Sequence, residues 1–251
     1  MTVRFLGTGG FINVGIPYNS FLIDRVHLIE SPPDIMVSLN RSGVRYQELK
    51  SIFVSHFHGD HYFGLPFLIL NLFNYYLETE RPPEKITMVG PKGLRHHIID
   101  LQKIAVAPDN PSVDWIDEAF SFVEIDQDSQ IPFGTASNMI FHRMNHAKET
   151  YGFSIIKDNE YRLTYLSDTK WDESFSQILL QRPQFVICDL NGGGSDKIKA
   201  HMSEEDITKK AMVLTGRATK YIGTHLRDHQ NAKNDDLAYA EIGHEFEIGE
   251  I

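Results

Sequence analysis

The sequence predicts an α/β fold in which two β-sheets lie face to face and helices cover their outer sides. The observation behind this prediction is that β-type runs occur in two blocks and that each block is followed by helical runs. The chain has 251 residues and 41% hydrophobic content, which is enough for a substantial core. Because no internal repeat and no long linker interrupts it, we expect a single domain over residues 1–251.

The first block consists of short β runs at residues 2–6, 20–24, 27–30, 52–54 and 86–89. Between the β runs of this block, residues 35–41 can form a helix after the Pro-Pro pair, and residues 64–77 form an apolar helical run. A further helix over 94–105 is predicted by the spacing of Leu94, Ile98 and Leu101. Residues 107–118 are rich in Pro, Asp and Asn, and we expect a loop there.

The second block begins with four successive β runs, which is an antiparallel pattern, at residues 120–125, 138–144, 151–156 and 161–166. Helical and β runs then alternate, at 174–181 (helix), 185–189 (strand), 203–215 (helix) and 220–223 (strand). Ser203 is the predicted N-cap of the last helix because three acidic residues occupy its first turn. The tail 245–248 can form an edge strand.

The composition predicts an acidic protein of the cytoplasm. There are 24 Lys and Arg against 34 Asp and Glu, a formal net charge of −10, which does not attract a long nucleic acid. The one cysteine, Cys188, excludes an internal disulfide and fits a reducing compartment. The N-terminus lacks the pattern of a signal peptide, and the apolar run 62–77 is short and interrupted for a membrane span.

Residues 56–61 read His-Phe-His-Gly-Asp-His, and they are the strongest functional signal in the chain. Imidazole and carboxylate ligands together suit zinc, manganese or iron, and the absence of cysteine disfavours a structural zinc finger. A strand that ends at Ser55 would place His56 and His58 in the following loop, around one ion. Gly59 would then let Asp60 and His61 turn to a second ion. A surface loop that is rich in histidine by chance is the alternative.

Further ligand-type residues follow predicted strands. His146 follows the run 138–144, Asp168 follows 161–166, and His225 follows 220–223. Each alone could be an ordinary polar loop residue. Their shared position just past a strand favours a common site, because a site between two sheets would collect residues from strand ends.

These residues, in this order, resemble the five motifs of the metallo-β-lactamase superfamily. The resemblance extends along nearly the whole chain and includes the opening Phe5-Leu-Gly-Thr-Gly-Gly10. It implies an αβ/βα four-layer sandwich of two mainly antiparallel sheets with helices outside. It also implies two divalent metal ions per chain, with zinc expected and manganese or iron as alternatives. By position, His56, His58 and His146 would hold the first ion. Asp60, His61 and His225 would hold the second, and Asp168 would bridge both.

Differences between this sequence and individual branches of the superfamily narrow the choice of branch. Zinc β-lactamases commonly carry a cysteine where Asp168 stands, and flavodiiron proteins carry a glutamate where Gly59 stands. Gly64-Leu-Pro, Gly90-Pro-Lys-Gly93 and Ala200-His201-Met-Ser203 are similar to the tRNA 3′-processing endonucleases (tRNase Z). Residues 94–120 are too short for the tRNA-gripping arm of that branch. Compact relatives without the arm act on small phosphodiesters such as cyclic nucleotides. The pair Pro32-Pro33 resembles a sequence feature of that compact group.

The resemblance therefore implies a metal-dependent hydrolase, and we expect a phosphodiesterase that acts on a small, cyclic or terminal phosphodiester. Asp60 would orient the attacking water or accept its proton. A histidine that binds no metal suits the protonation of the leaving group near neutral pH. His201 is the candidate for that catalytic role, with Asp189 as its orienting carboxylate.

Three alternatives stay open at this stage. They are hydrolysis of a carboxylic ester, thioester or lactone, tRNA 3′ processing without the arm, and a metal-stabilised binding protein without catalysis. As partners we expect a small phosphodiester, with an RNA end as an alternative, and no membrane. A homodimer through the helix 64–77 is also expected, because that helix has more apolar surface than one core-facing stripe requires.

Overall fold

The computed structural model describes residues 1–81, 84–192, 200–228 and 237–249. The chain divides into two compact units. The first unit contains Met1–Gly7, Pro17–Ile125 and Ile242–Phe246. The second unit contains Thr8–Ile16, Asp126–Glu241 and Glu247–Ile251. The expectation of a single domain over 1–251 stays a prediction.

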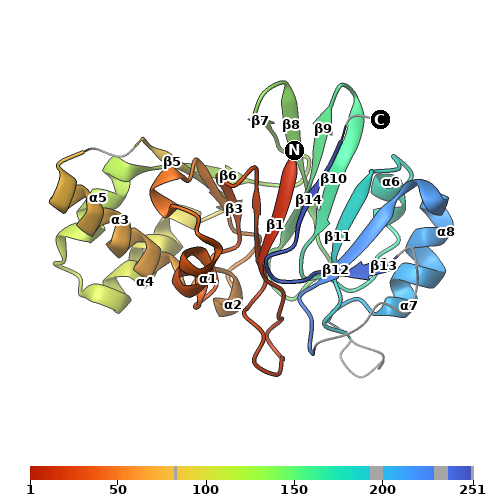
Figure 1. Ribbon diagram of the computed structural model, residues 1–251, viewed down its shortest axis with the longest axis horizontal. Coiled ribbons are helices and arrows are strands. Elements are labelled where there is room, and N and C mark those ends of the chain that lie inside the picture. The colour runs from red at the N-terminus through yellow and green to blue at the C-terminus, as the bar shows by residue number, and fades with distance from the viewer. Residues whose placement is uncertain (82–83, 193–199, 229–236, 250–251) are drawn as a thin grey trace. The chain divides into compact units, whose positions relative to one another are not determined.

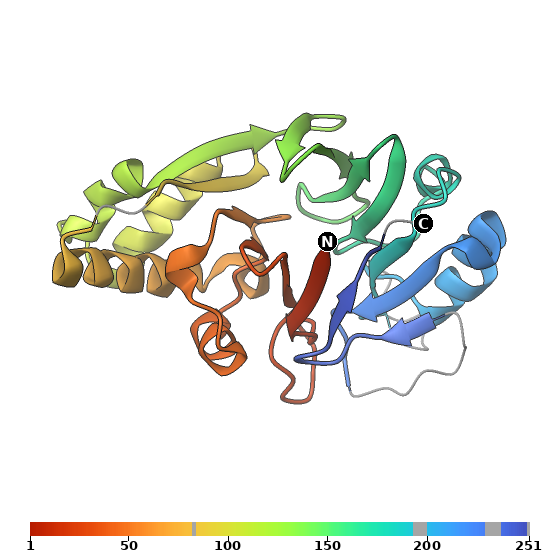
Figure 2. The ribbon, with the colours of Figure 1, turned by 45° about the horizontal axis from the view of Figure 1, so that its top comes forward.

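The first unit is built on a seven-stranded sheet with the strand order β14-β1-β2-β3-β4-β5-β6 (Figure 1). Its strands are β1 (Thr2–Gly7), β2 (Ser20–Ile23), β3 (His27–Ile29), β4 (Ser51–Phe53), β5 (Ile86–Pro91), β6 (Phe120–Ile125) and β14 (Glu245–Glu247). The strands β1 to β3 pair antiparallel, whereas β3 to β6 pair parallel. The last strand of the chain therefore lies beside the first, as Figure 2 shows with β14 in blue and β1 in red.

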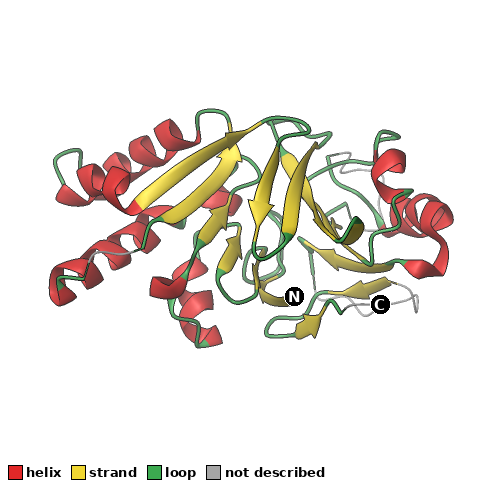
Figure 3. Ribbon diagram, turned by 90° about the horizontal axis from the view of Figure 1, so that it is seen from above, coloured by secondary structure: helices red, strands yellow, loops and turns green. Residues whose placement is uncertain are grey.

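The helices of the first unit connect these strands. They are α1 (Ile35–Ser42), the 3₁₀ turn Tyr46–Glu48, α2 (Gly59–Tyr62), α3 (Leu65–Thr79), α4 (Leu94–Val106) and α5 (Pro111–Ala119). The helices α3, α4 and α5 pack on one another, and α4 and α5 lie against β6 (Figure 3). Leu68, Leu72 and Phe73 of α3 are buried in this core. The expected dimer contact rests on the apolar side chains Phe67, Leu68, Leu72, Phe73 and Tyr76 of this helix. Of these five, Phe67 is the one that is more than half exposed.

The second unit is built on a seven-stranded sheet with the order β13-β12-β11-β10-β9-β8-β7. Its strands are β7 (Gln130–Phe133), β8 (Ser137–Arg143), β9 (Tyr151–Lys157), β10 (Glu160–Leu166), β11 (Phe185–Asp189), β12 (Lys220–Thr224) and β13 (Leu237–Tyr239). The strands β7 to β10 pair antiparallel, and β10 to β13 pair parallel. Both sheets are thus mixed rather than mainly antiparallel, because in each one a meander is followed by crossover connections.

The helices of the second unit are α6 (Phe175–Leu179), α7 (Glu204–Asp206), a π-helical turn Ile207–Ala211, α8 (Met212–Thr215) and the 3₁₀ turn Gly216–Ala218. The predicted N-cap is confirmed: the Ser203 hydroxyl accepts from the Asp206 N–H, and the Asp206 carboxylate accepts from the Ser203 N–H. These helices share one buried core cluster with the sheet. The cluster includes Phe175, Leu179, Ile207 and Ala211 from the helical segments and Leu166, Val186 and Cys188 from the strands. No described helix is both long and apolar enough to cross a lipid bilayer.

The prediction of a loop over residues 107–118 was wrong. The segment 107–118 contains a helix, α5, rather than a loop. Asn110 caps it by accepting from the Ser112 N–H, and Pro111 occupies its first position, where a missing N–H costs nothing. Trp115 and Ile116 are buried, so packing decides the structure of a segment whose composition is typical of a loop.

Candidate metal centre

The first group of candidate ligands follows β4 in the first unit. The strand ends at Phe53. The next two residues, Val54 and Ser55, are fully buried, and His56 follows them in the loop. The chain then turns into the single helical turn α2, in which the His61 N–H donates to the His58 carbonyl. The loop and the helical turn together bring His56, His58, Asp60 and His61 into one small region, as the motif predicts.

The side chains of this group converge. The Nε2 atom of His56 lies 2.9 Å from Nδ1 of His58, and the His56 and His61 ring centroids are 4.2 Å apart. The Nε2 atom of His61 is 3.5 Å from Oδ2 of Asp60. Two nitrogens bound to one tetrahedral zinc at about 2.0–2.1 Å would be about 3.3 Å apart. The spacing of His56 and His58 is therefore close to that of two ligands of a shared ion.

Glu30 belongs to this group, although the sequence reasoning gave it no role. It follows β3, is fully buried and has a left-handed backbone with φ of 63°. Its Oε1 lies 3.3 Å from Nδ1 of His61, and its Oε2 accepts the Ser55 N–H at 3.1 Å. Carboxylates that bind the second nitrogen of a ligand histidine fix its orientation. In the sequence, the feature that could have indicated this role is a single carboxylate that stands between a β run and two prolines.

The second group of candidate ligands lies in the second unit, at the ends of parallel strands. Leu166 of β10 is in register with Cys188 of β11, and Asp189 of β11 is in register with Thr224 of β12. Asp168, Asp189 and His225 therefore emerge at the same edge of the sheet. Because the carboxyl ends of parallel strands meet at one edge, residues that are distant in sequence become neighbours there.

Asp189 is the centre of this second group, and it contacts both histidines. Its Oδ2 lies 2.6 Å from Nδ1 of His201, and its Oδ1 lies 3.1 Å from Nδ1 of His225. The Thr169 and Asn191 backbone N–H groups donate to the same carboxylate, at 3.1 and 2.9 Å. The predicted contact of Asp189 with His201 is present, and Asp189 also contacts His225, which no sequence pattern indicated.

Charge and burial have opposite effects on the pKa values of Asp189 and His201. Burial raises the pKa of Asp189, but the charges of His201 and His225 outweigh burial and hold this pKa below its usual range. Burial lowers the pKa of His201, whereas the charge of Asp189 and its hydrogen bond raise it, and the net pKa lies above 6.5. The pair therefore favours a carboxylate that accepts from a protonated imidazole.

Asp168 lies between the other members of this group. Its Oδ1 is 3.5 Å from Nδ1 of His225, and its Oδ2 is 3.9 Å from Nε2 of His146 and 3.9 Å from Nδ1 of His201. All of these side chains are buried or nearly so. The structure thus brings the predicted residues of the second unit together. A ligand set drawn from both units stays a prediction.

The donor sets fit a divalent metal ion. In the second unit, one atom each of Asp168, Asp189, His201 and His225 can be chosen so that all lie within 4.8 Å of one another. In the first unit, ring nitrogens of His56 and His58 are 2.9 Å apart, and a ring nitrogen of His61 is 3.5 Å from a carboxylate oxygen of Asp60. Buried carboxylates and imidazoles at such distances suit zinc, manganese or iron.

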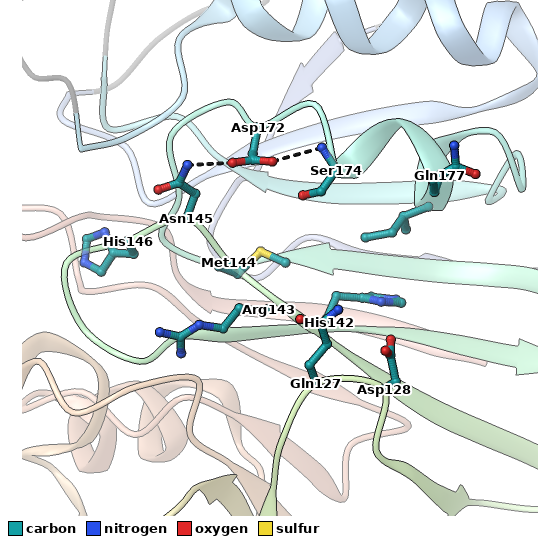
Figure 4. A pocket seen from close by; sticks show the side chains of 11 residues that line it. Gln127, Asp128, His142, Arg143, Met144, Asn145, His146, Asp172, Ser174 and Gln177 are labelled. Atoms are coloured by element: carbon teal, nitrogen blue, oxygen red, sulfur yellow. Dashed lines mark hydrogen bonds between the residues drawn. The ribbon is translucent and has the colours of Figure 1, made fainter.

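A cavity of about 610 Å³ lies beside His146 in the second unit. Figure 4 shows its lining, in which Asn145 donates to Asp172 and the Ser174 N–H donates to the other Asp172 oxygen. The lining residues are Gln127, Asp128, His142, Arg143, Met144, Asn145, His146, Asp172, Ser174, Gln177 and Ile178. The cavity thus combines a polar wall with two apolar side chains, Met144 and Ile178.

Comparison with solved structures shows the fold. YhfI of Bacillus subtilis, a metallo-β-lactamase fold protein, superposes with a TM-score of 0.75 at 14% identity, covering 98% of each chain. The short form of human tRNase Z gives 0.74 at 19% identity, covering 99% of this chain and all of the other. Zinc-bound PqqB of Methylobacterium extorquens gives 0.71 at 12% identity, with coverage of 98% and 100%. The predicted metallo-β-lactamase fold is confirmed.

Comparison of sequences identifies relatives among the ribonucleases Z and BN. Ribonuclease Z of Picrophilus torridus is 41% identical over 71 residues, which are 27% of this chain and 23% of the relative. Ribonuclease BN of Salmonella paratyphi C is 27% identical over 172 residues, 64% of this chain and 51% of the relative. The chain spans about half the length, or less, of these relatives. The predicted resemblance to the tRNase Z branch is confirmed.

The family model described as "Anti-Pycsar protein Apyc1" matches residues 1–233. The matched segment contains every candidate ligand described above, from His56 to His225. Since it covers most of the 251 residues, the chain belongs to the Apyc1 family of anti-Pycsar proteins.

Proposed function

We propose that this protein is a metal-dependent hydrolase that cleaves a small, cyclic or terminal phosphodiester. The observation that carries the proposal is the Asp189 carboxylate, which contacts His225, a candidate ligand, and His201, a histidine outside the ligand motifs. One carboxylate thereby orients a metal ligand and a proton donor. The relation to ribonuclease BN supports a phosphodiester substrate, since that linkage joins the nucleotides of RNA.

The proposed ligands are divided between two ions. His56, His58 and His146 would hold the first ion, Asp60, His61 and His225 would hold the second, and Asp168 would contribute to both. Zinc is the expected ion, because its imidazole and carboxylate ligands are those present, and manganese or iron are the alternatives. When bound, such a pair of ions lowers the pKa of a water molecule towards 7 and neutralises charge on the phosphoryl oxygens.

The side chains outside this ligand set handle protons and orientation. Since Asp189 accepts from Nδ1 of His201, Nε2 of His201 is the atom that can donate to the leaving alkoxide. The raised pKa of His201, which the Asp189 charge and hydrogen bond cause against the effect of burial, favours the protonated form of this nitrogen. Asp60 has a second proposed role, in which it orients the attacking water or accepts its proton.

A small substrate is favoured by the segment between β5 and β6. Residues 94–119 form α4 and α5, which pack on α3 and β6, and this segment forms no projecting arm. The net charge of −10 also disfavours a long polyanion. The cavity beside His146 offers room for the part of a substrate that lies away from the scissile bond. The end of an RNA is the second candidate substrate, favoured by the ribonuclease relatives.

The test is a panel of substrates with protein prepared without chelator. It comprises a cyclic nucleotide, a bis-nitrophenyl phosphodiester, a tRNA precursor with a 3′ extension, a lactone and a thioester. We expect turnover of the two small phosphodiesters and loss of turnover in His58→Ala. Faster cleavage of the lactone or thioester would favour the carboxylic ester alternative, and faster cleavage of the precursor would favour tRNA processing. Two bound metals without any turnover would favour a binding protein.

A further inference from the structure

His225 adopts a backbone conformation that has to be held in place. Its φ is +57°, in the left-handed region that side chains other than glycine rarely occupy. A residue with this conformation is strained, and it persists only where its surroundings hold it in place. The side chain of His225 is fixed at one end by Asp189, whose Oδ1 lies 3.1 Å from Nδ1. The backbone of His225 needs a second support.

Asn191 supplies that support. Its Nδ2 donates to the His225 carbonyl at 2.9 Å and lies 3.4 Å from the Ile12 carbonyl. Its own backbone N–H donates to Oδ1 of Asp189, which is the oxygen that contacts His225. The side chain is 1% exposed. With two carbonyls facing it, the amide can only be oriented with its nitrogen towards them.

Gly10 makes this arrangement possible. A Cβ at residue 10 would lie 1.7 Å from Nδ2 of Asn191 and 2.7 Å from the His225 carbonyl oxygen. The Gly10 N–H donates to the Leu226 carbonyl at 2.8 Å, so the backbone of this loop lies directly against the residue that follows His225. The close approach requires glycine, because any side chain would displace the Asn191 amide.

We propose that Asn191 is a positioning residue for His225, in addition to the ligands and the proton donor. Asp189 fixes Nδ1 of the ring, Asn191 fixes the carbonyl of the same residue, and the direction of Nε2 follows from both. This inference rests on the proposed function, in which His225 binds a metal ion. Outer partners of metal ligands typically change metal affinity by about 10–100-fold when removed.

The test compares Asn191→Asp and Asn191→Ala with the wild-type protein by titrating the metal-stripped protein with zinc and with cobalt. Asn191→Asp has nearly the same shape but places an oxygen against two carbonyls. We expect both variants to bind one of the two ions about 10–100-fold more weakly and to show a changed cobalt absorption spectrum. Gly10→Ala should have the same effect, because the added Cβ would displace the Asn191 amide and crowd the His225 carbonyl that it supports. The matched control is Gln102→Ala, which removes a buried amide that donates to Ser112 in the first unit.

The outcomes separate this inference from the proposed function. If His225→Ala loses no metal, the ligand assignment is wrong, whatever the Asn191 variants do. If His225→Ala loses one ion but Asn191→Asp and Gly10→Ala bind both ions with unchanged affinity and spectrum, the positioning role is wrong. If Gln102→Ala weakens metal binding as much as the Asn191 variants at equal loss of thermal stability, the effect is general destabilisation, and the positioning role is again wrong.

Discussion

Oε1 of Glu30 lies 3.3 Å from Nδ1 of His61, and both side chains are completely buried. We expect Glu30→Gln to weaken the binding of the ion that His61 holds by about 10–100-fold, because the carboxylate orients the ring and raises its basicity. Zinc titration of the metal-stripped protein measures this. Glu48→Gln is the control, since Glu48 is exposed and pairs with Arg45. Equal zinc affinity in the two variants would show that Glu30 has only a packing role.

Protein prepared without chelator should contain about two divalent ions per chain, because seven proposed ligands exceed what one tetrahedral ion uses. Asp168→Ala should lose both ions, since its carboxylate is the proposed bridge. Elemental analysis checks both statements, with exposed Asp114→Ala as the control. A maximum of one ion in the wild-type protein would contradict the dinuclear proposal, and loss of a single ion in Asp168→Ala would contradict the bridge.

His201→Ala should keep its metal and its fold, while kcat for a substrate with a poor leaving group falls by about 10²–10⁴. The loss should shrink for a nitrophenyl phosphodiester, whose leaving group barely needs a proton. In the wild-type protein, kcat for the poor leaving group should fall as the pH rises through the raised pKa of His201, because the donor is then deprotonated. Equal losses on both substrates would leave His201 a phosphate-binding role.

Acid should destabilise the second unit through His142. Its Nε2 lies 2.8 Å from the Ser154 hydroxyl, and burial lowers its pKa to about 4. Above pH 6.5 the ring is neutral in the folded and unfolded states. Between pH 6.5 and about 4 only the unfolded chain takes up the proton, so the free energy of unfolding falls by up to about 3 kcal/mol.

The substitution His142→Gln tests this, because an amide can still bond to Ser154 but cannot take up a proton. Urea unfolding at several pH values should show a smaller acid-induced loss of stability in His142→Gln than in wild type. The exposed His96→Gln should behave as wild type. Parallel stability curves for wild type and His142→Gln would show that His142 does not cause the loss.

The expected homodimer through α3 stays a prediction, and the structure reduces the surface available for it. Phe67 and Leu77 are 53% and 57% exposed, whereas Leu68 and Leu72 belong to the core of the first unit. If α3 forms the contact, Phe67→Glu should convert a dimer to a monomer without unfolding it, since the exposed ring is not part of the core. Light scattering at micromolar concentration measures this, and a monomeric wild-type protein would refute the contact.

Much of the fold could be predicted because the hydrophobic periodicity of each segment agrees with the way its side chains pack in the core. The strand Phe185–Asp189 has the predicted bounds, and α4 extends one residue beyond its prediction. The segment α5 was missed because Asn110 and Pro111, which are typical of loops, are also the cap and first residue of a helix. The strands β7 and β13 are short, and each pairs with a single neighbour at the edge of the sheet, so their sequences contain little periodicity.

The candidate ligands could be predicted from the histidine motif and from strand ends, but their supports could not. Glu30 and Asn191 act through contacts with residues 31 and 34 positions away in the chain. No spacing rule connects such pairs, because a parallel sheet brings them together only after its crossovers have formed. For the same reason the left-handed backbone of His225 is visible only in the structure.

The position of Asp168 and His225 just beyond their strands has a consequence for the evolution of such proteins. Neither residue belongs to the hydrogen-bonded ladder that joins β10, β11 and β12. A substitution at residue 168 or 225 therefore changes the chemistry of this edge without removing a ladder bond or a core side chain. A lineage could exchange ligands there, and with them its reaction, while natural selection on folding leaves the sheet unchanged.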